Sequence, residues 1–157
     1  MRKIRGMVRP LAAVALALVL ASCVNAFGLD SERERDRLDR NWSRWDQARI
    51  FDYDYVVERS CYCGFEITEP VRVVVRDGRV VDRYYVRSGF GVDPYYWSIF
   101  PSIDGLFSEV ADAIHTADEL DVSYERDFGF PVRVGIDYHR NAADDEVSIR
   151  TYGFVYR

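Results

Sequence analysis

The chain has 157 residues, which is enough for one domain, and its 21 basic and 26 acidic side chains give it a formal net charge of −5. Residues 1–22 have the pattern of a signal peptide, because four basic side chains precede an apolar stretch at residues 11–21. That stretch covers roughly half of a ~30 Å hydrocarbon core, which is too short for a permanent transmembrane helix. Removal of residues 1–22 takes away four basic and no acidic side chains, so the net charge falls to −9. This charge argues against nucleic acid as a partner.

The segment Leu20-Ala21-Ser22-Cys23 resembles the lipobox of bacterial lipoproteins. The resemblance implies that a diacylglycerol is attached to the Cys23 sulfur, that fatty acyl chains such as palmitate hold the protein at a membrane, and that cleavage occurs before Cys23. An ordinary signal peptide followed by a chance cysteine is the alternative. We therefore expect a cell-envelope protein that faces the periplasm or the exterior, with a tether at residues 23–30 and a single domain at residues 31–157.

The first helix and strand of that domain follow from hydrophobic periodicity. Ser31 and Glu34 fit a capping box, which predicts a helix that ends near residue 49. Its expected apolar face consists of Leu38, Trp42 and Trp45. Residues 51–58 then alternate between apolar and acidic side chains, which predicts a strand whose apolar face is formed by Phe51, Tyr53, Tyr55 and Val57.

The remaining elements are marked by turns and by a second helical stripe. Asp77-Gly78 predicts a tight hairpin between strands at residues 71–76 and 79–87. Residues 88–101 are rich in aromatic side chains and are expected to form a loop. Pro101-Ser102 begins a predicted helix that reaches Ala117, with an apolar stripe at Ile103, Leu106, Phe107, Val110, Ile114 and Ala117. Further strands are predicted at residues 122–126, 132–138 and 146–156, with a polar loop at residues 139–145.

This order predicts an α+β fold in which two helices pack on one face of an antiparallel sheet of about six or seven strands. Short connections argue against a parallel, doubly wound sheet. The segments at residues 69–73 (EPVRV) and 130–134 (FPVRV) resemble each other. The match suggests a duplicated unit of one helix and one antiparallel meander, with chance similarity as the alternative.

A set of short motifs recurs in a known order along the domain: Trp45, Tyr53-x-Tyr55, Cys61-Tyr62-Cys63, the Val71–Gly78 hairpin, Ile103–Phe107, Val122-x-Tyr124, Gly129-Phe130-Pro131, Ile136-Asp137 and Asp144-Asp145-Glu146. In these motifs the chain resembles an uncharacterised bacterial family of small exported, often lipid-anchored domains of unknown function. The resemblance covers roughly residues 40–150, brings no known activity or cofactor, and departs from the family at Tyr124-Glu125, where Tyr-Asp is expected.

Cys61 and Cys63 are expected to form a disulfide, because an even pair of cysteines remains in an oxidising compartment once Cys23 is acylated. In an extended strand their Cα atoms would lie ~6.6–6.8 Å apart, at the edge of the range that a disulfide tolerates. A bridge therefore requires a local bend, which Gly64 permits. The alternation of the preceding strand points both cysteines toward the core. Buried reduced thiols, or redox or metal chemistry, are the alternatives.

The aromatic loop is the strongest candidate for a binding site, because Tyr and Trp are favoured contact residues and loops often bind partners. Such a cluster suits an envelope protein partner or the sugar rings of a cell-wall glycan. The alternative is that the rings fold back and bury themselves as a satellite core. The candidate contact residues are Phe90, Tyr95, Tyr96, Trp97 and Phe100.

The sequence selects no catalytic residues, no metal ligands and no cofactor. The two histidines, His115 and His139, lack the spacing of a metal pair. His139 near Asp137, Asp144 and Asp145 suggests at most a weak cation site, and a solvated hairpin loop is the simpler interpretation. The function indicated is therefore that of a lipid-anchored module that binds a macromolecule. A redox or metal-handling protein that uses Cys61 and Cys63, or a structural envelope component, remain as alternatives.

Overall fold

The structure is a computed structural model that describes residues 31–142 and 144–157. The expected signal peptide, Cys23 and the tether up to residue 30 lie outside the described residues. None of the described helices combines the length and the hydropathy that crossing a membrane requires.

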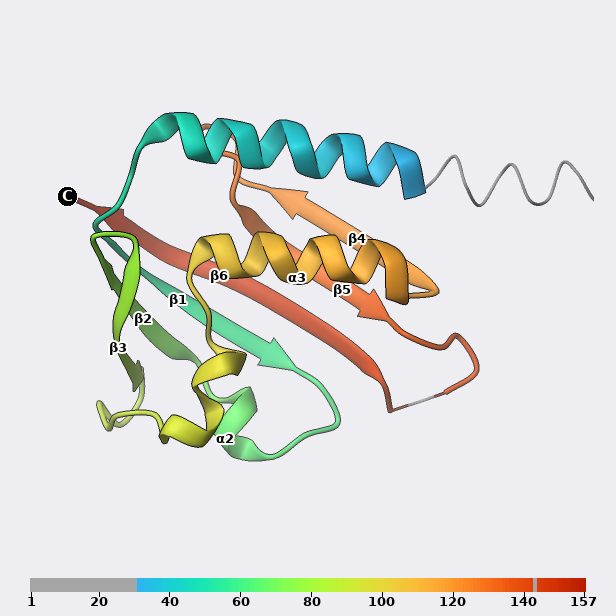
Figure 1. Ribbon diagram of the computed structural model, residues 1–157. Coiled ribbons are helices and arrows are strands. Elements are labelled where there is room, and N and C mark those ends of the chain that lie inside the picture. Colours follow the sequence, from blue (N-terminus) through green and yellow to red (C-terminus); the bar gives the residue numbers. More distant parts are fainter. Residues whose placement is uncertain (1–30, 143) are drawn as a thin grey trace, which may run out of the picture.

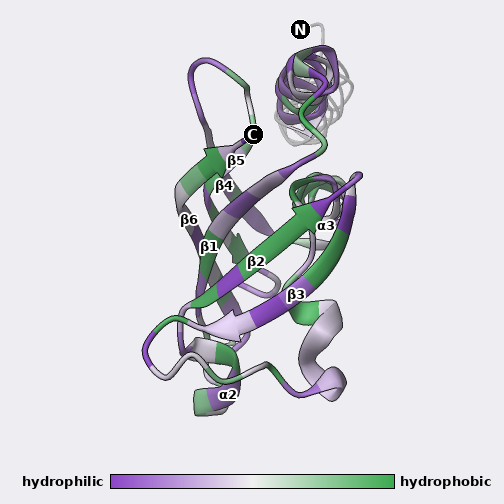
Figure 2. Cartoon of the chain, turned by 90° about the vertical axis from the view of Figure 1, so that its left-hand side faces the viewer, coloured by the Kyte–Doolittle hydropathy of each residue, from purple (hydrophilic) through white to green (hydrophobic). Residues whose placement is uncertain are grey.

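The described chain forms a six-stranded sheet with two longer helices on one face (Figure 1, Figure 2). The strands lie in the order β3-β2-β1-β6-β5-β4, and all neighbours are antiparallel. The predicted α+β fold is therefore confirmed. In chain order the elements are a helix at residues 31–48, β1 (Tyr53–Ser60), α2 (Phe65–Thr68), β2 (Val71–Arg76), β3 (Arg79–Tyr85), the 3-10 helix η1 (Pro94–Ile99), α3 (Ile103–Thr116), β4 (Glu119–Tyr124), β5 (Pro131–Asp137) and β6 (Glu146–Tyr156).

Each half of the domain consists of one long helix followed by a three-stranded meander, and the pairing of β1 with β6 joins the two meanders. The similar segments at residues 69–73 and 130–134 lead into β2 and β5, which each lie second from an edge of the sheet. A common origin of the two halves stays a prediction.

The helix at residues 31–48 packs through the stripe that the sequence predicts. Leu38 and Trp45 are buried, and Trp42 stacks on Phe107 of α3 with 5.2 Å between ring centroids. Ser31, which was expected to precede this helix as its cap, is itself helical.

The helix α3 begins where the sequence predicts, because the Ser102 hydroxyl accepts a hydrogen bond from the Gly105 amide (3.3 Å). Its buried side chains include four of the expected stripe, Ile103, Leu106, Phe107 and Val110. Ala113, which was not expected, is buried as well, whereas Ile114 and the capping residue Ala117 are only partly buried.

The tyrosines of β1 join the sheet to the start of α3. The Tyr53 hydroxyl accepts a hydrogen bond from the Ile103 amide (3.0 Å), and the Tyr55 hydroxyl donates to the Pro101 carbonyl (2.6 Å). Burial raises the pKa of both hydroxyls well above its ordinary value. Both tyrosines therefore act as core residues whose polar ends are satisfied by backbone.

Two of the expected element limits differ clearly from the structure, and one short helix was not expected. Phe51 precedes β1 and is half exposed, with the Arg49 guanidinium 5.2 Å from its ring centroid. The strand expected at residues 122–126 is β4, which begins earlier, at Glu119, and ends at Tyr124, because the Glu125 carboxylate accepts the amides of the following turn. The four residues of α2 are too few to show a hydrophobic period of a helix in the sequence.

Candidate functional site

The aromatic loop at residues 88–101 lies beside the end of β3 and folds partly into the 3-10 helix η1 (Figure 1). The Asp93 carboxylate caps η1 by accepting a hydrogen bond from the Tyr95 amide (2.8 Å). Before η1, the loop pairs with the outer edge of β3: the Tyr85 amide donates to the Phe90 carbonyl and the Val92 amide to the Arg83 carbonyl, each at 2.9 Å. The loop is thus fixed to the sheet by backbone hydrogen bonds.

The five predicted contact residues divide into exposed and buried side chains. Phe90 is 75% exposed, Tyr95 83% and Trp97 48%, whereas Tyr96 packs partly against the core. Phe100 is completely buried, so its assignment as a contact residue is corrected: its ring belongs to the core. The alternative of a satellite core therefore holds for Phe100 and in part for Tyr96, and a binding role of the exposed residues stays a prediction.

Trp97 is held in place by the end of β3. Its indole N–H donates to the Val92 carbonyl (2.9 Å), and the Arg83 guanidinium lies 5.5 Å from its ring centroid. Arg83 is itself fixed by a hydrogen bond from its Nε to the Phe100 carbonyl (2.6 Å). The exposed part of the indole is consequently presented in one orientation.

Phe65 and Tyr62 are exposed aromatic residues that the sequence analysis missed. Phe65 begins α2, which contacts η1, and is 61% exposed, while Tyr62 is 87% exposed. A four-residue helix has no hydrophobic period that signals which side chains it exposes. We use the name aromatic end for Phe65, Phe90, Tyr95 and Trp97.

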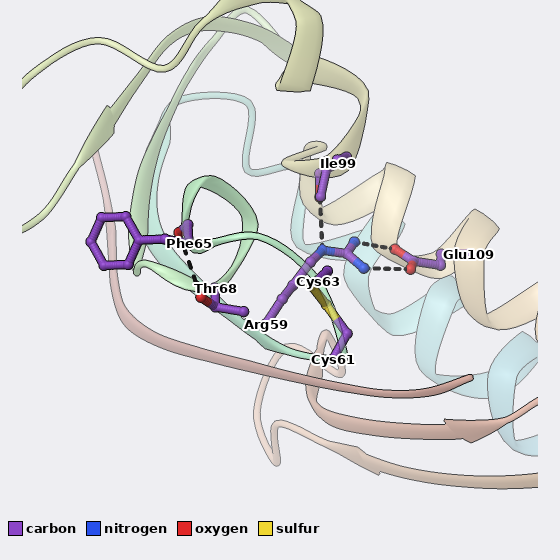
Figure 3. Close-up of a disulfide and its surroundings, with 7 residues drawn as sticks. All are labelled: Arg59, Cys61, Cys63, Phe65, Thr68, Ile99 and Glu109. Atoms are coloured by element: carbon purple, nitrogen blue, oxygen red, sulfur yellow. Dashed lines mark hydrogen bonds and ion pairs between the residues drawn. A yellow bond between two sulfur atoms is a disulfide. The ribbon is translucent and has the colours of Figure 1, made fainter. Parts of the chain in front are cut away.

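Cys61 and Cys63 form the expected disulfide, with their Cα atoms 5.3 Å apart (Figure 3). The chain leaves β1 at Ser60 and bends, which brings the Cα atoms within the range of protein disulfides. The expectation that the pair faces the core is wrong, because Cys63 is exposed and Cys61 is only partly buried. The bend ends the alternation on which that expectation rested.

Next to the disulfide, Arg59 links three elements (Figure 3). Its two terminal nitrogens bind the two Glu109 carboxylate oxygens of α3 at 2.8 and 2.6 Å, and its Nε donates to the Ile99 carbonyl of η1 at 2.9 Å. Only 8% of the Arg59 side chain is exposed. This bidentate pair fixes the C-terminal end of η1 against α3.

Tyr85, at the end of β3, contacts α2 through its side chain. The Tyr85 hydroxyl donates to the Glu66 carbonyl (3.2 Å). Burial raises the Tyr85 pKa, and the charges of Glu66, Glu69 and Asp93 raise it further. Glu69 is only 7% exposed, and its Oε1 has no hydrogen-bond partner in the described structure.

A separate cavity of about 550 Å³ lies at the ends of β1, β4 and β5 and the start of β6. Its acidic lining consists of Glu119, Asp121, Asp137, Asp144 and Glu146. His139, the centre of the weak cation site considered from the sequence, instead pairs through Nδ1 with the Asp145 carboxylate at 2.7 Å. Within residues 31–142 and 144–157, no three His, Cys, Asp or Glu side chains are placed to hold a metal ion.

Comparison with known proteins gives one match. No curated protein and no solved structure matches the chain significantly. The model of a family of unknown function matches residues 37–155, which contain β1 to β5, all of β6 except its last residue, the disulfide and the aromatic end. The expectation of an uncharacterised family is confirmed: the chain belongs to the family of unknown function DUF6174.

Proposed function

We propose that this protein is a lipid-anchored module of the bacterial cell envelope that binds another protein through its aromatic end. The observation that carries the proposal is the exposure of Phe90, Tyr95 and Trp97 on a segment that backbone hydrogen bonds fix to the sheet. Large exposed aromatic side chains on an ordered loop are typical of protein interfaces.

The rigidity of η1 supports this proposal. The Asp93 cap fixes its start, the Arg59–Glu109 pair fixes its end, and Arg83 holds the Trp97 ring. A surface that is ordered before binding loses less conformational entropy when a partner arrives. A mere satellite core would not expose Tyr95 at 83%.

The position of the aromatic end suits a tethered protein. The blue start of the helix at residues 31–48 lies at the upper right of Figure 1 and η1 at its lower left. A lipid on Cys23, which precedes residue 31, would attach the domain to the membrane through the end of the chain that lies away from η1. The proposed surface is then available to a partner in the adjoining compartment.

Site-specific photocrosslinking in the native host tests the binding role. A photoreactive amino acid at position 95 of the full chain is expected to give a defined crosslinked protein, whereas one at Tyr152, 41% exposed on β6, is not. The captured protein is then purified and titrated against the Tyr95→Ala and Trp97→Ala variants. We expect each to weaken binding at least about tenfold, with Tyr152→Ala as the unchanged control.

Equal affinity of all three variants would overturn the proposal. Cosedimentation of the protein with purified cell wall, lost in Trp97→Ala, would instead assign the surface to a glycan. The anchor is tested separately: incorporation of a palmitate analogue is expected in the wild type and absent in Cys23→Ser.

The exposure of Cys63 keeps a redox role as the second candidate. Thiol labelling of the native protein after mild reduction separates the two functions. A pair that needs denaturation before it is reduced supports a structural disulfide, and an easily cycled pair supports redox chemistry.

A further inference from the structure

We propose that a cavity between η1 and α3 binds a neutral polyhydroxylated ligand, the chemistry of a sugar ring, through Arg59, Glu109 and Tyr138. This site is separate from the aromatic end, and the inference goes beyond the protein-binding function. We refer to it as the η1–α3 cavity.

The η1–α3 cavity has a volume of about 410 Å³ and opens to solvent. Small-molecule sites in proteins usually enclose about 300–1,000 Å³. One wall is a polar face of α3, because Ser108, Glu109 and Asp112 lie within about one turn on the same side of the helix. The remaining walls come from η1, from Arg59 of β1 and from Tyr138, which directly follows β5.

Arg59 brings unused hydrogen-bond donors to this cavity. Only 8% of its side chain is exposed. A guanidinium has five N–H donors. Arg59 uses three of them, one from Nε to the Ile99 carbonyl and one from each terminal nitrogen to Glu109 (Figure 3). The other two have no acceptor among the described residues, although Arg59 lines the cavity. A buried donor without an acceptor is unfavourable, so the cavity has to supply an oxygen, from water in the free protein and from a ligand hydroxyl in the complex.

Hydrogen-bond acceptors lie on the same cavity wall. Each Glu109 oxygen accepts one hydrogen bond from Arg59, which leaves lone pairs for a further donor. Asp112 is exposed and forms no ion pair within the described chain. Burial raises the pKa of the Tyr138 hydroxyl, and the charges of Glu109 and Asp112 raise it further. The Tyr138 hydroxyl therefore stays protonated and can both donate and accept.

This mixture of donors and acceptors favours hydroxyl groups over charged ligands. Glu109 and Asp112 would repel an anion. A cation would find Glu109 already neutralised by Arg59, and an exposed carboxylate such as Asp112 contributes little to an ion pair. An apolar molecule would leave the Arg59 donors unpaired. A sugar hydroxyl donates to a carboxylate and accepts from a guanidinium at the same time, and Ile99 and Pro101 in the cavity wall suit the C–H face of a sugar ring.

NMR titration of the isotope-labelled full chain tests the site. The protein is kept in lauryldimethylamine oxide, because this detergent has no sugar headgroup. The probes are the methyl glycosides of glucose, galactose, mannose and N-acetylglucosamine, with acetate as the anionic and methylammonium as the cationic comparison. We expect at least one glycoside to give saturable, salt-insensitive shifts of the Ser108 and Tyr138 amide signals, and the two ions to give none.

Three variants locate the binding. Ser108→Phe is expected to abolish it, because the added ring fills the cavity while Arg59 and Glu109 keep their contacts. Ser43→Phe is the matched control, since Ser43 is an exposed helical serine that does not line the cavity. Tyr138→Phe is expected to weaken binding about fivefold, because it removes one hydrogen bond and keeps the shape of the ring.

The inference would be overturned if none of the four glycosides gave saturable shifts, if either ion gave an equal response, or if Ser108→Phe or Tyr138→Phe bound as the wild type does. If Ser108→Phe does not fold, Ser98→Phe replaces it, because Ser98 lines the same cavity from η1. Trp97→Ala should keep the affinity for the glycoside, because Trp97 does not line the cavity. Its loss would move sugar binding to the aromatic end and overturn the cavity assignment, whereas failure of the cavity alone leaves the protein-binding function standing.

Discussion

Gly129 lies directly against Asn41 of the helix at residues 31–48. A Cβ atom at Gly129 would be 2.6 Å from the Asn41 carbonyl oxygen, and the backbone φ of Gly129 is +83°. Residues that carry a side chain rarely adopt this φ, and the backbone oxygen of Asn41 cannot move aside for a Cβ atom. Both conditions therefore require glycine. This contact sets how closely the turn before β5 approaches the helix.

Gly129→Ala is therefore expected to destabilise the domain by about 3 kcal/mol, the sum of backbone strain and overpacking. Gly89→Ala is the matched control, because its φ is +71° but nothing lies within 4 Å of the added Cβ. It should cost only about 1 kcal/mol. Urea unfolding of both variants checks the difference, and equal losses would contradict the close approach.

Glu109→Gln is expected to lower the free energy of unfolding by about 3 kcal/mol, because it leaves the buried Arg59 guanidinium without its counter-ion. The loss should also loosen η1, since Arg59 binds the Ile99 carbonyl. Hydrogen exchange of the η1 amides, together with urea unfolding, measures both effects.

Glu58→Gln provides the control for that experiment. Glu58 pairs with Arg150 at 2.6 Å on the exposed side of the sheet, where water screens the interaction. We expect little change in stability and none in η1. A comparable loss in the two variants would show that the Arg59–Glu109 pair has no special role.

Replacement of both Cys61 and Cys63 by alanine is expected to cost less than about 2 kcal/mol, because the disulfide closes a loop of only three residues. The domain should still fold and keep its aromatic end. Circular dichroism and urea unfolding in the presence and absence of a reductant test this expectation. Loss of folding would mean that the bridge holds more than the local bend.

Stability should fall steeply at alkaline pH. The pKa values of Tyr53, Tyr55 and Tyr124 are raised above their ordinary value of 10, in each case chiefly by burial. The folded state keeps protons that the unfolded chain releases, so the stabilisation is complete below about pH 10 and is lost as the pH rises beyond it. Each tyrosine contributes a slope of about 1.4 kcal/mol per pH unit.

Tyr124→Phe isolates one of these contributions. The Tyr124 hydroxyl is buried without a hydrogen-bond partner, so its removal should not reduce stability near neutral pH. Urea unfolding from about pH 9 to about pH 11 should show a shallower decline than in the wild type. An identical decline would assign the alkaline sensitivity to other groups.

Periodic patterns predicted most of the fold. Leu38 and Trp45 at helical spacing, and Tyr53 and Tyr55 in alternation, become buried where the sequence indicates. The hairpin at Asp77-Gly78 forms with both residues at positive φ, as its sequence favours. The element limits were less predictable, because strand pairing in the folded sheet decides that β4 begins at Glu119 and that Phe51 lies outside β1.

The candidate site was only partly predictable. The sequence located the aromatic loop and the cysteine pair, but Phe100 in the same loop fills the core and Phe65 outside it is exposed. Local sequence does not distinguish the rings of Phe100 and Phe65, because the exposure of each ring depends on the parts of the sheet and of α3 that pack against it. The Arg59–Glu109 pair joins residues too distant in the chain for any spacing to reveal.

By itself the sequence determined the two helical stripes, the alternating strands and the need for a bend at Cys61-x-Cys63, because each depends on neighbours a few residues away. Only the tertiary structure decided the strand order, the close contact of Gly129 with Asn41 and the unpaired burial of Glu69. These features arise only when segments far apart in the chain pack against one another. The free energy gained by removing their surfaces from water depends on which surfaces are buried together, and the sequence of a single segment does not specify this.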